Sequence, residues 1–281
     1  MPAIVVPVKY VPGTWSEKSL EADFTLDRHN VDGEIDEVNQ YAVEAALRIK
    51  EAWPVDGETV SVIAVTVGPD KAVEALRKAI AMGADTAVLL ADPAVAGSDA
   101  LATARAIDAL IGYVEDHVIN SPVSLIVTGS ASSDGFTGAI SGMLAEIRHM
   151  PAITSAEKFA VVTADDGASY TLTGTRVAPD GVWELSAPLP ALLSVTDGAE
   201  QFRFPNFKSL AAAKKAEIPT VSLADIGVEP ATVGANGSLT AVTAAAKQPG
   251  RTRGTVIYDR GDAAATAAAI ADFLDERGLL N

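Results

Sequence analysis

The residues with the clearest chemical potential lie in one short segment, Gly129-Ser-Ala-Ser-Ser-Asp-Gly-Phe-Thr-Gly138. Its small residues let a backbone come close to a phosphate, and Ser133 and Thr137 add hydroxyl donors. A helical pattern follows, so the free N–H groups of that helix would face an anion. Asp134 is poorly suited to direct phosphate contact and is expected to bind backbone amides and shape the loop. The segment predicts a nucleotide phosphate site, with a flexible turn as the alternative.

Two other predicted strand ends point to the same place. Residues 4–9 and 60–67 are short apolar runs, with Pro7-Val8-Lys9 and Thr66-Val67-Gly68 at their ends, and the loop follows a third run, 125–128. If these strands are neighbours, their carboxyl ends form the edge at which open α/β sheets bind ligands. Backbone groups at such ends can bind an adenine edge. For Lys9, an exposed surface charge is the alternative interpretation.

Strand-like and helical patterns alternate over the first 150 residues, which is typical of βαβ units. Helices are expected over residues 37–50, over 71–82 with Gly83 as a left-handed C-cap, and from an N-cap at Ser98 to Ile111; residues 87–90 are expected as a strand. The polar stretch 11–36 is too long for an ordinary connection, and loops of that length usually bind something. The pattern and the aliphatic composition predict an α/β fold with a mostly parallel sheet.

Beyond Pro151 the pattern changes. Residues 170–177 and 183–186 alternate in period two around Pro179-Asp180-Gly181, which predicts a hairpin, and residues 191–195 read as a last strand. After Ile226 the chain is rich in Ala, Thr and Gly, and it ends in an amphipathic helix, residues 263–276. We therefore expect an α/β domain over residues 1–225, with a hairpin near 168–195, and a C-terminal arm and helix over 226–281. The arm is expected to pack on a partner, with a surface helix of the same domain as the equal alternative.

Composition excludes several classes of function. The 281 residues include no cysteine, which removes disulfides, Fe–S clusters, thiolate zinc sites and cysteine nucleophiles, and three scattered histidines make a metal site improbable. The glycine fingerprints of dinucleotide sites and P-loops and the nucleophile elbow are missing. A net charge of −16 argues against nucleic acid and anionic membranes as partners. With no apolar run of membrane-spanning length and no basic leader, a cytoplasmic location is expected.

Several segments, read in order, resemble the electron transfer flavoprotein beta-subunit family. The matching segments are 4–13 (IVVPVKYVPG), 35–46 (IDEVNQYAVEAA), 65–69 (VTVGP), 75–85 (ALRKAIAMGAD), 189–194 (LPALLS), 203–215 (RFPNFKSLAAAKK) and 223–229 (LADIGVE). The most specific of them is 65–85, which is very similar to V-x-x-G-P followed by L-R-x-A-L-A-M-G-A-D. The resemblance covers the chain from Ile4 to about Glu229.

The resemblance implies a three-layer, doubly wound sheet of the adenine-nucleotide-binding type and a heterodimer. An alpha subunit would hold most of the FAD, and this chain would bury AMP in a structural role. Electrons would pass from acyl-CoA or other dehydrogenases, as in fatty acid oxidation, to a quinone oxidoreductase. The protein itself would be an electron carrier without catalytic side chains.

By position, the resemblance places AMP on Pro7, Val67, residues 36–39 and residues 129–140, and it places Thr14 or Trp15, and Val38, near the flavin. Together with the strand ends, this gives as candidate cofactor-binding residues Pro7, Lys9, Asp36, Val38, Asn39, Thr66, Val67, Gly68, Gly129, Ser130, Ser133, Asp134, Gly135, Phe136, Thr137, Gly138 and Ile140.

Departures from the family pattern leave alternatives open. Asp134, Gly135 and Thr137 also occur in the D-G-D-T loop of an electron-bifurcating branch that carries a second FAD, but Phe136 interrupts that pattern, so AMP is favoured. The family's partner-recognition loop has a bulky aliphatic anchor where this chain has Ala199, which puts docking by an inserted leucine in doubt. A stand-alone adenine-nucleotide sensor and an NAD-dependent enzyme are the alternatives from other classes.

Overall fold

A parallel sheet forms the centre of the computed structural model, which describes residues 2–28, 30–53, 59–199, 201–246, 250, 254, 256–258 and 261–280. Within these residues one sheet has the order β12-β5-β4-β1-β6-β11-β7, and its recorded pairings are all parallel. The strands are β1 (Ala3–Pro7), β4 (Ser61–Val67), β5 (Thr86–Leu90), β6 (Leu125–Gly129), β7 (Ala152–Ala156), β11 (Ala191–Val195) and β12 (Thr220–Val221). Most are continuous apolar runs, as strands covered on both faces must be.

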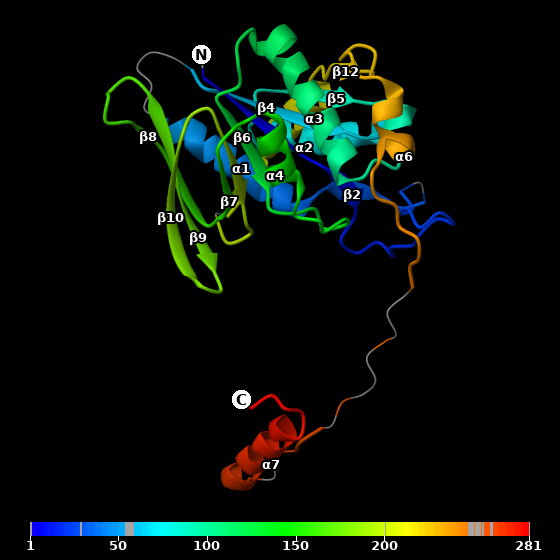
Figure 1. The fold of residues 1–281 in the computed structure, drawn as a ribbon, viewed down its shortest axis with the longest axis vertical. Coiled ribbons are helices and arrows are strands. Elements are labelled where there is room, and N and C mark those ends of the chain that lie inside the picture. Colours follow the sequence, from blue (N-terminus) through cyan, green and yellow to red (C-terminus); the bar gives the residue numbers. More distant parts are fainter. Residues whose placement is uncertain are drawn as a thin grey trace. The chain divides into compact units, whose positions relative to one another are not determined.

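Helices cover both faces of this sheet (Figure 1). Alternate strand residues point to opposite faces: Ile4 and Val6 pack with α1 (Glu37–Ala52) and α2 (Val73–Met82), whereas Val5 packs with α3 (Ala100–Val114) and α4 (Ile140–Ile147). The apolar positions of each helix recur at helical spacing and are buried against the sheet. The predicted three-layer, doubly wound α/β fold is confirmed.

A second, antiparallel sheet adds to the α1 side. It has the order β10-β9-β8, from β8 (Lys158–Thr163), β9 (Tyr170–Ala178) and β10 (Gly181–Pro188), and it lies beside β7 and α1 (Figure 1). The predicted hairpin is confirmed, and Gly181, with a φ of +140°, follows its turn. Buried Val161 and Leu172 join the α1-side core, so this sheet is an extension of the main domain.

The long polar stretch before α1 contains a small ribbon in which β2 (Tyr10–Pro12) pairs with β3 (Gly33–Ile35). The ribbon was not predicted, because segments of three residues carry too little periodicity. It brings the end of the stretch back to β1, directly before the first turn of α1.

One predicted helix cap was wrong. Asp99, not Ser98, caps α3: its carboxylate accepts a hydrogen bond from the Ala102 amide at 2.9 Å. The Ser98 hydroxyl instead donates to the Val95 carbonyl at 2.7 Å, which closes the preceding turn, η2 (Pro93–Val95). Both residue types are good N-caps, so residue type alone could not choose between them. The helix continues through a π turn, η3 (Glu115–Ile119).

The described chain forms two compact units, Met1–Thr243 and Ala244–Asn281. The first also contains η1 (Asp70–Ala72), α5 (Phe207–Lys215), η4 (Pro230–Thr232) and α6 (Gly234–Gly237); the second contains α7 (Ala263–Asp275), capped by Asp262. The terminal helix is confirmed, whereas the division at 225/226 and the packing of an arm on a partner stay predictions. Among the described residues, no helix combines the length and apolar character needed to cross a membrane.

Candidate functional site

The candidate site lies where the direction of strand addition reverses. β1 is central: the chain adds β4 and β5 on one side of it and later adds β6 on the other side. The carboxyl ends of β1 and β6 flank this switch point, where open α/β sheets bind ligands. Lys9 follows β1, the loop 129–138 begins at the end of β6, and Thr66 to Gly68 end β4, the other neighbour of β1. The structure therefore brings together the three strand ends on which the sequence analysis depends.

Gly129 lets α1 approach the end of β6. A Cβ atom at this position would lie 2.8 Å from Val38 Cγ1 and 3.0 Å from Asn39 Nδ2, so a larger residue would push the helix away. The Asn39 amide oxygen also accepts a hydrogen bond from the Lys9 backbone N–H at 2.8 Å. The first turn of α1 is thus fixed to the ends of both strands that flank the switch point.

Asp36 joins the loop to the same helix. Its side chain is buried, and as the N-cap of α1 it accepts from the Val38 amide at 3.0 Å. Its other oxygen accepts from the Ser133 amide at 2.7 Å and from the Ser133 hydroxyl at 2.8 Å. Asp36 and Ser133 therefore hold the shape of the loop, and the Ser133 hydroxyl is already used inside the protein.

Asp134 is the electrostatic centre of the loop. Its carboxylate is buried and forms ion pairs with Lys9, at 2.7 Å, and with Arg28, and it also accepts from the Gly135 amide. Burial by itself raises the pKa of Asp134, but the charge and hydrogen bond of Lys9, and then those of Arg28, outweigh it, so the pKa lies well below its usual range. As expected, Asp134 binds a backbone amide and shapes the loop. Its two cations were not foreseen as partners.

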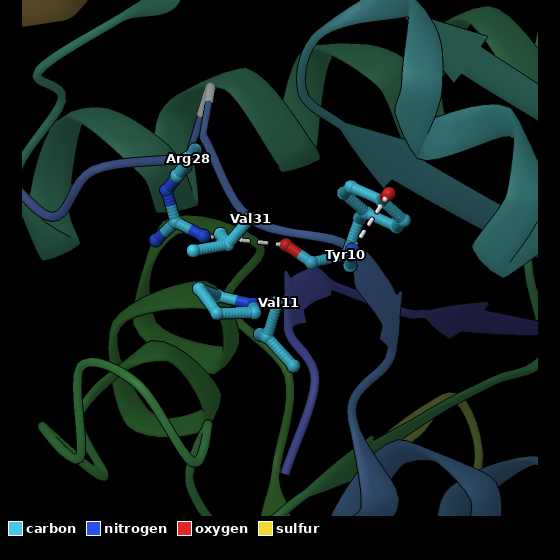
Figure 2. Close-up of a pocket in the computed structure, with 6 residues that line it drawn as sticks. Tyr10, Val11, Arg28 and Val31 are labelled. Atoms are coloured by element: carbon cyan, nitrogen blue, oxygen red, sulfur yellow. Dashed lines mark hydrogen bonds between the residues drawn. The ribbon is translucent and has the colours of Figure 1, made fainter. Parts of the chain in front are cut away.

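Arg28 is the site residue that the sequence analysis missed. It comes from the 11–36 stretch, and Figure 2 shows its side chain beside Val31, with one nitrogen directed to the Tyr10 carbonyl at 3.3 Å. The pocket at this point has a volume of about 10 Å³, room for roughly one water molecule, so it is too small for a nucleotide. The only sequence signal was the unusual length of the stretch, which indicates a role without naming a residue.

The far end of the loop presents backbone. Phe136 and Gly138 have φ values of +51° and +62°, and the phenylalanine ring is largely exposed together with Thr137. α4 follows directly, and its N-cap residue, Ala139, has no side chain that could bond to the first-turn amides. Amides at a helix start that no side chain caps are suited to an anion. Ile140, the first residue of α4, is half-buried on the side of α3.

Thr66 contributes an unused polar atom near the end of β4. Its hydroxyl is buried and has no hydrogen-bond partner in the described structure, a state shared there only with Trp53 Nε1 and Arg148 Nε. An unpaired buried hydroxyl costs free energy, so such groups usually have a partner. The neighbouring Gly68 amide is bonded to the Leu90 carbonyl at 3.1 Å.

The remaining predicted site residues lie around this centre. Pro7 and Ser130 are half-buried at the ends of β1 and β6, and the Ser130 amide is bonded to the Val195 carbonyl. Thr14 and Trp15 lie beyond β2, where the Thr14 amide donates to Glu34 and the indole ring of Trp15 is almost wholly exposed.

This geometry defines a class: a doubly wound α/β protein in which charged and amide-bearing loops meet at the switch point of its sheet.

A family model described as "Electron transfer flavoprotein domain" matches residues 23–226. The electron transfer flavoprotein subunit beta of Mycobacterium tuberculosis (strain H37Rv) is 41% identical over 263 residues, which is 93% of this chain and 94% of that protein. That of Megasphaera elsdenii is 31% identical over 92% of both chains. Protein FixA of Azotobacter vinelandii is 32% identical over 85% of this chain and 82% of its own length.

The chain belongs to the electron transfer flavoprotein beta-subunit family. The resemblance seen in the sequence is confirmed, and with it the coarse function, a subunit of an electron-transferring flavoprotein.

Proposed function

We propose that this chain binds AMP at the switch point and, with a larger alpha subunit, holds the FAD of a heterodimeric electron carrier. The carrier would accept electrons from acyl-CoA or other dehydrogenases and pass them to a quinone oxidoreductase, in the cytoplasm. The flavin supplies the redox chemistry when bound, and the residues of this chain position and shield it.

The observation that carries the proposal is the loop 129–138 at the switch point. Its fold depends on two buried carboxylates, Asp36 and Asp134, whose bonds are all made within the protein. Because the side chains serve the loop, the backbone at Gly138 and the uncapped start of α4 are left for the ligand. This is the arrangement that suits a phosphate on backbone amides.

Two cationic side chains also lie beside the loop. Lys9 and Arg28 remain 40% and 33% exposed although both pair with Asp134. Both cations are therefore partly accessible beside the loop, and we propose that they contact the phosphate. The Thr66 hydroxyl, on the strand next to β1, is buried and has no hydrogen-bond partner in the described structure, and we propose that the nucleotide supplies one.

The test is to produce the chain together with the larger subunit and to identify what the complex retains. Purified complex is denatured with acid, and the released nucleotides are separated by chromatography and counted per heterodimer. One FAD and one AMP per complex support the proposal. Two FAD molecules and no AMP would establish the electron-bifurcating alternative that Asp134, Gly135 and Thr137 left open. A colourless complex, or a chain that never binds the larger subunit, contradicts the proposal.

A matched pair of variants locates the nucleotide. Thr137→Val removes an exposed hydroxyl from the loop, and Thr163→Val removes one from the exposed end of β8. We expect the first variant to retain several-fold less AMP and the second to retain the wild-type amount, because only the loop hydroxyl faces the proposed phosphate. Equal retention in both would place the nucleotide elsewhere.

A further inference from the structure

Residues 13–32, which connect β2 to β3, form a long segment with little support from the core. Among its described residues, 13–28 and 30–32, only Asp27 is buried. The pairing recorded within it is an isolated bridge between Leu20 and Leu26. A segment with so few buried side chains opens locally at a small free-energy cost. We call residues 13–32 the strap, and its position must depend on a few specific contacts.

Both ends of the strap are fixed on the β2–β3 ribbon. The Tyr10 ring packs so closely on Gly33 that a Cβ atom there would lie 2.3 Å from ring atom Cζ, and the Tyr10 hydroxyl accepts from the Gly33 amide at 3.1 Å. At the other end, the Gly13 amide donates to the Asp32 carbonyl at 2.9 Å. These contacts do not involve the loop 129–138, so the ends of the strap stay in place whatever the loop binds.

Arg28 joins the strap to the loop 129–138. Its guanidinium donates to the Tyr10 carbonyl at 3.3 Å (Figure 2) and forms the ion pair with Asp134. The side chain of Asp134 is 1% exposed and that of Arg28 is 33% exposed, so the loop supplies the buried partner and the strap the accessible one. Asp134 also pairs with Lys9, which closely follows β1. Two cations thus share one carboxylate, and of these Lys9 is fixed to the sheet whereas Arg28 is carried by the strap.

The accessible part of Arg28 can bond to a second anion. A phosphate at the loop would supply that anion, and hydrogen bonds between a guanidinium and a phosphate are among the stronger ones in proteins. A nucleotide therefore binds more tightly when the strap is docked, with Arg28 at the loop, than when the strap is displaced. A ligand that binds one conformation better shifts the population toward it.

We propose that Arg28 is a positioning residue through which a bound nucleotide orders the strap. The inference rests on the proposed function and adds a conformational response to it. Without nucleotide the strap is held to the loop through Asp134, and AMP adds a phosphate contact to the same guanidinium. Because such coupling is reciprocal, the docked strap raises the affinity for AMP by the factor by which AMP favours docking.

The experiment measures hydrogen exchange in the flavin-bearing complex with the larger subunit. Nucleotide is removed from the complex, AMP is added back to saturation, and exchange of backbone amides is followed by mass spectrometry in peptides from residues 14–28. We expect AMP to slow exchange in these peptides about tenfold, within the range typical of coupling between sites. Peptides from residues 171–176 of β9 serve as an internal reference, and their exchange should stay unchanged.

Arg28→Gln tests the guanidinium, and Arg176→Gln is the matched control, because Arg176 bonds instead to Thr154 of β7, at 3.2 Å. With each variant saturated with AMP, we expect the strap to slow less than about twofold in Arg28→Gln and about tenfold in Arg176→Gln. AMP should also bind about tenfold more weakly to Arg28→Gln. Arg28→Lys keeps a charge that can pair with Asp134 and should recover part of the response.

Each outcome decides a different claim. A tie that is merely structural would speed exchange in Arg28→Gln by the same factor with and without AMP, and the inference would then be wrong. If AMP binds to the wild-type complex without slowing exchange in the strap, the inference is also wrong, although the proposed function stands. If the wild-type complex binds no AMP, the proposed function itself fails before any variant is compared.

Discussion

Two buried carboxylates, Glu44 and Asp134, have nearly the same chemistry and different places in the fold. Glu44 lies inside α1 and bonds to Arg48 one turn on, at 2.7 Å, and to Arg203. Asp134 lies in the loop after β6 and bonds to Lys9 and Arg28. In both cases burial raises the pKa of the carboxyl, but the cationic partners lower it by more, so both carboxyls remain ionised.

The difference lies in what the ion pairs connect. Glu44 ties one helix to the segment that precedes α5, and its bonds leave it no capacity for anything else. Asp134 connects the end of β1, the long 11–36 stretch and the loop, all at the switch point where this fold binds ligands. A perturbed pKa alone does not distinguish a structural carboxylate from one in a binding site, because both kinds of group are perturbed. From their positions in the fold, we assign Glu44 a structural role and propose that Asp134 belongs to a binding site.

The largest expected effect follows from removing the structural carboxylate. Glu44→Gln removes the buried charge that Arg203 and Arg48 share, although Arg203 keeps its exposed pair with Glu51. Breaking a buried ion pair from one side typically costs about 3–5 kcal/mol. Because Arg203 is about one-third exposed, we expect the free energy of unfolding, measured in urea, to fall by about 2–3 kcal/mol.

Glu51→Gln is the matched control. It removes the exposed partner of the same arginine, so it should cost less than about 1 kcal/mol. If both variants lost the same unfolding free energy, burial would not distinguish these two ion pairs, and the structural role assigned to Glu44 would be wrong.

Asp134→Asn should affect binding more than stability. Its two cations can turn toward water, so we expect a loss of about 1–2 kcal/mol in unfolding free energy. The loop, however, loses the charge that fixes it, and we expect the complex to bind AMP about tenfold more weakly in a titration after nucleotide is removed. Should stability fall as far as in Glu44→Gln while AMP binding is unchanged, Asp134 would be structural too.

The fold was more predictable than the site. Apolar runs and helical spacing identified β1, β4, β6 and the helices that cover them, because each carries its own periodicity. Arg28 and Asp134 are 106 residues apart, and no local pattern connects them. Likewise, the bond from Arg203 to Glu44 spans 159 residues. Such pairs exist only once the sheet has brought its strand ends together, so residue type alone cannot reveal them.

Lowering the pH should reduce the contribution that both carboxylates, Glu44 and Asp134, make to the free energy of unfolding. Each has a lower pKa in the folded chain than the usual value of about 4. Its contribution to stability is therefore complete above that value and is lost as the pH falls toward the folded-state pKa. We expect the stability gap between wild type and Glu44→Gln to be constant from about pH 6 to 8 and to shrink as the pH falls from about 4 toward 3. Urea titrations at each pH measure it, and a gap that widens in acid would reverse the assigned sign.

Thr66 provides a further test of which polar groups are structural and which belong to the site, because its buried hydroxyl has no partner in the described structure. Thr66→Val replaces the hydroxyl with a methyl group of similar size, so the empty chain no longer buries an unpaired polar atom. We expect unfolding free energy without nucleotide to rise by up to about 1 kcal/mol and AMP to bind a few-fold more weakly.

The matched control is Thr128→Val, on β6, whose hydroxyl lies 2.8 Å from that of buried Ser141. Breaking that bond should destabilise the chain by about 1 kcal/mol. Opposite signs in the two variants would show that the group near the sheet edge is reserved for a ligand. A loss of stability in Thr66→Val with unchanged AMP binding would assign its hydroxyl to the core instead, and the site would then depend on the loop and the start of α4 alone.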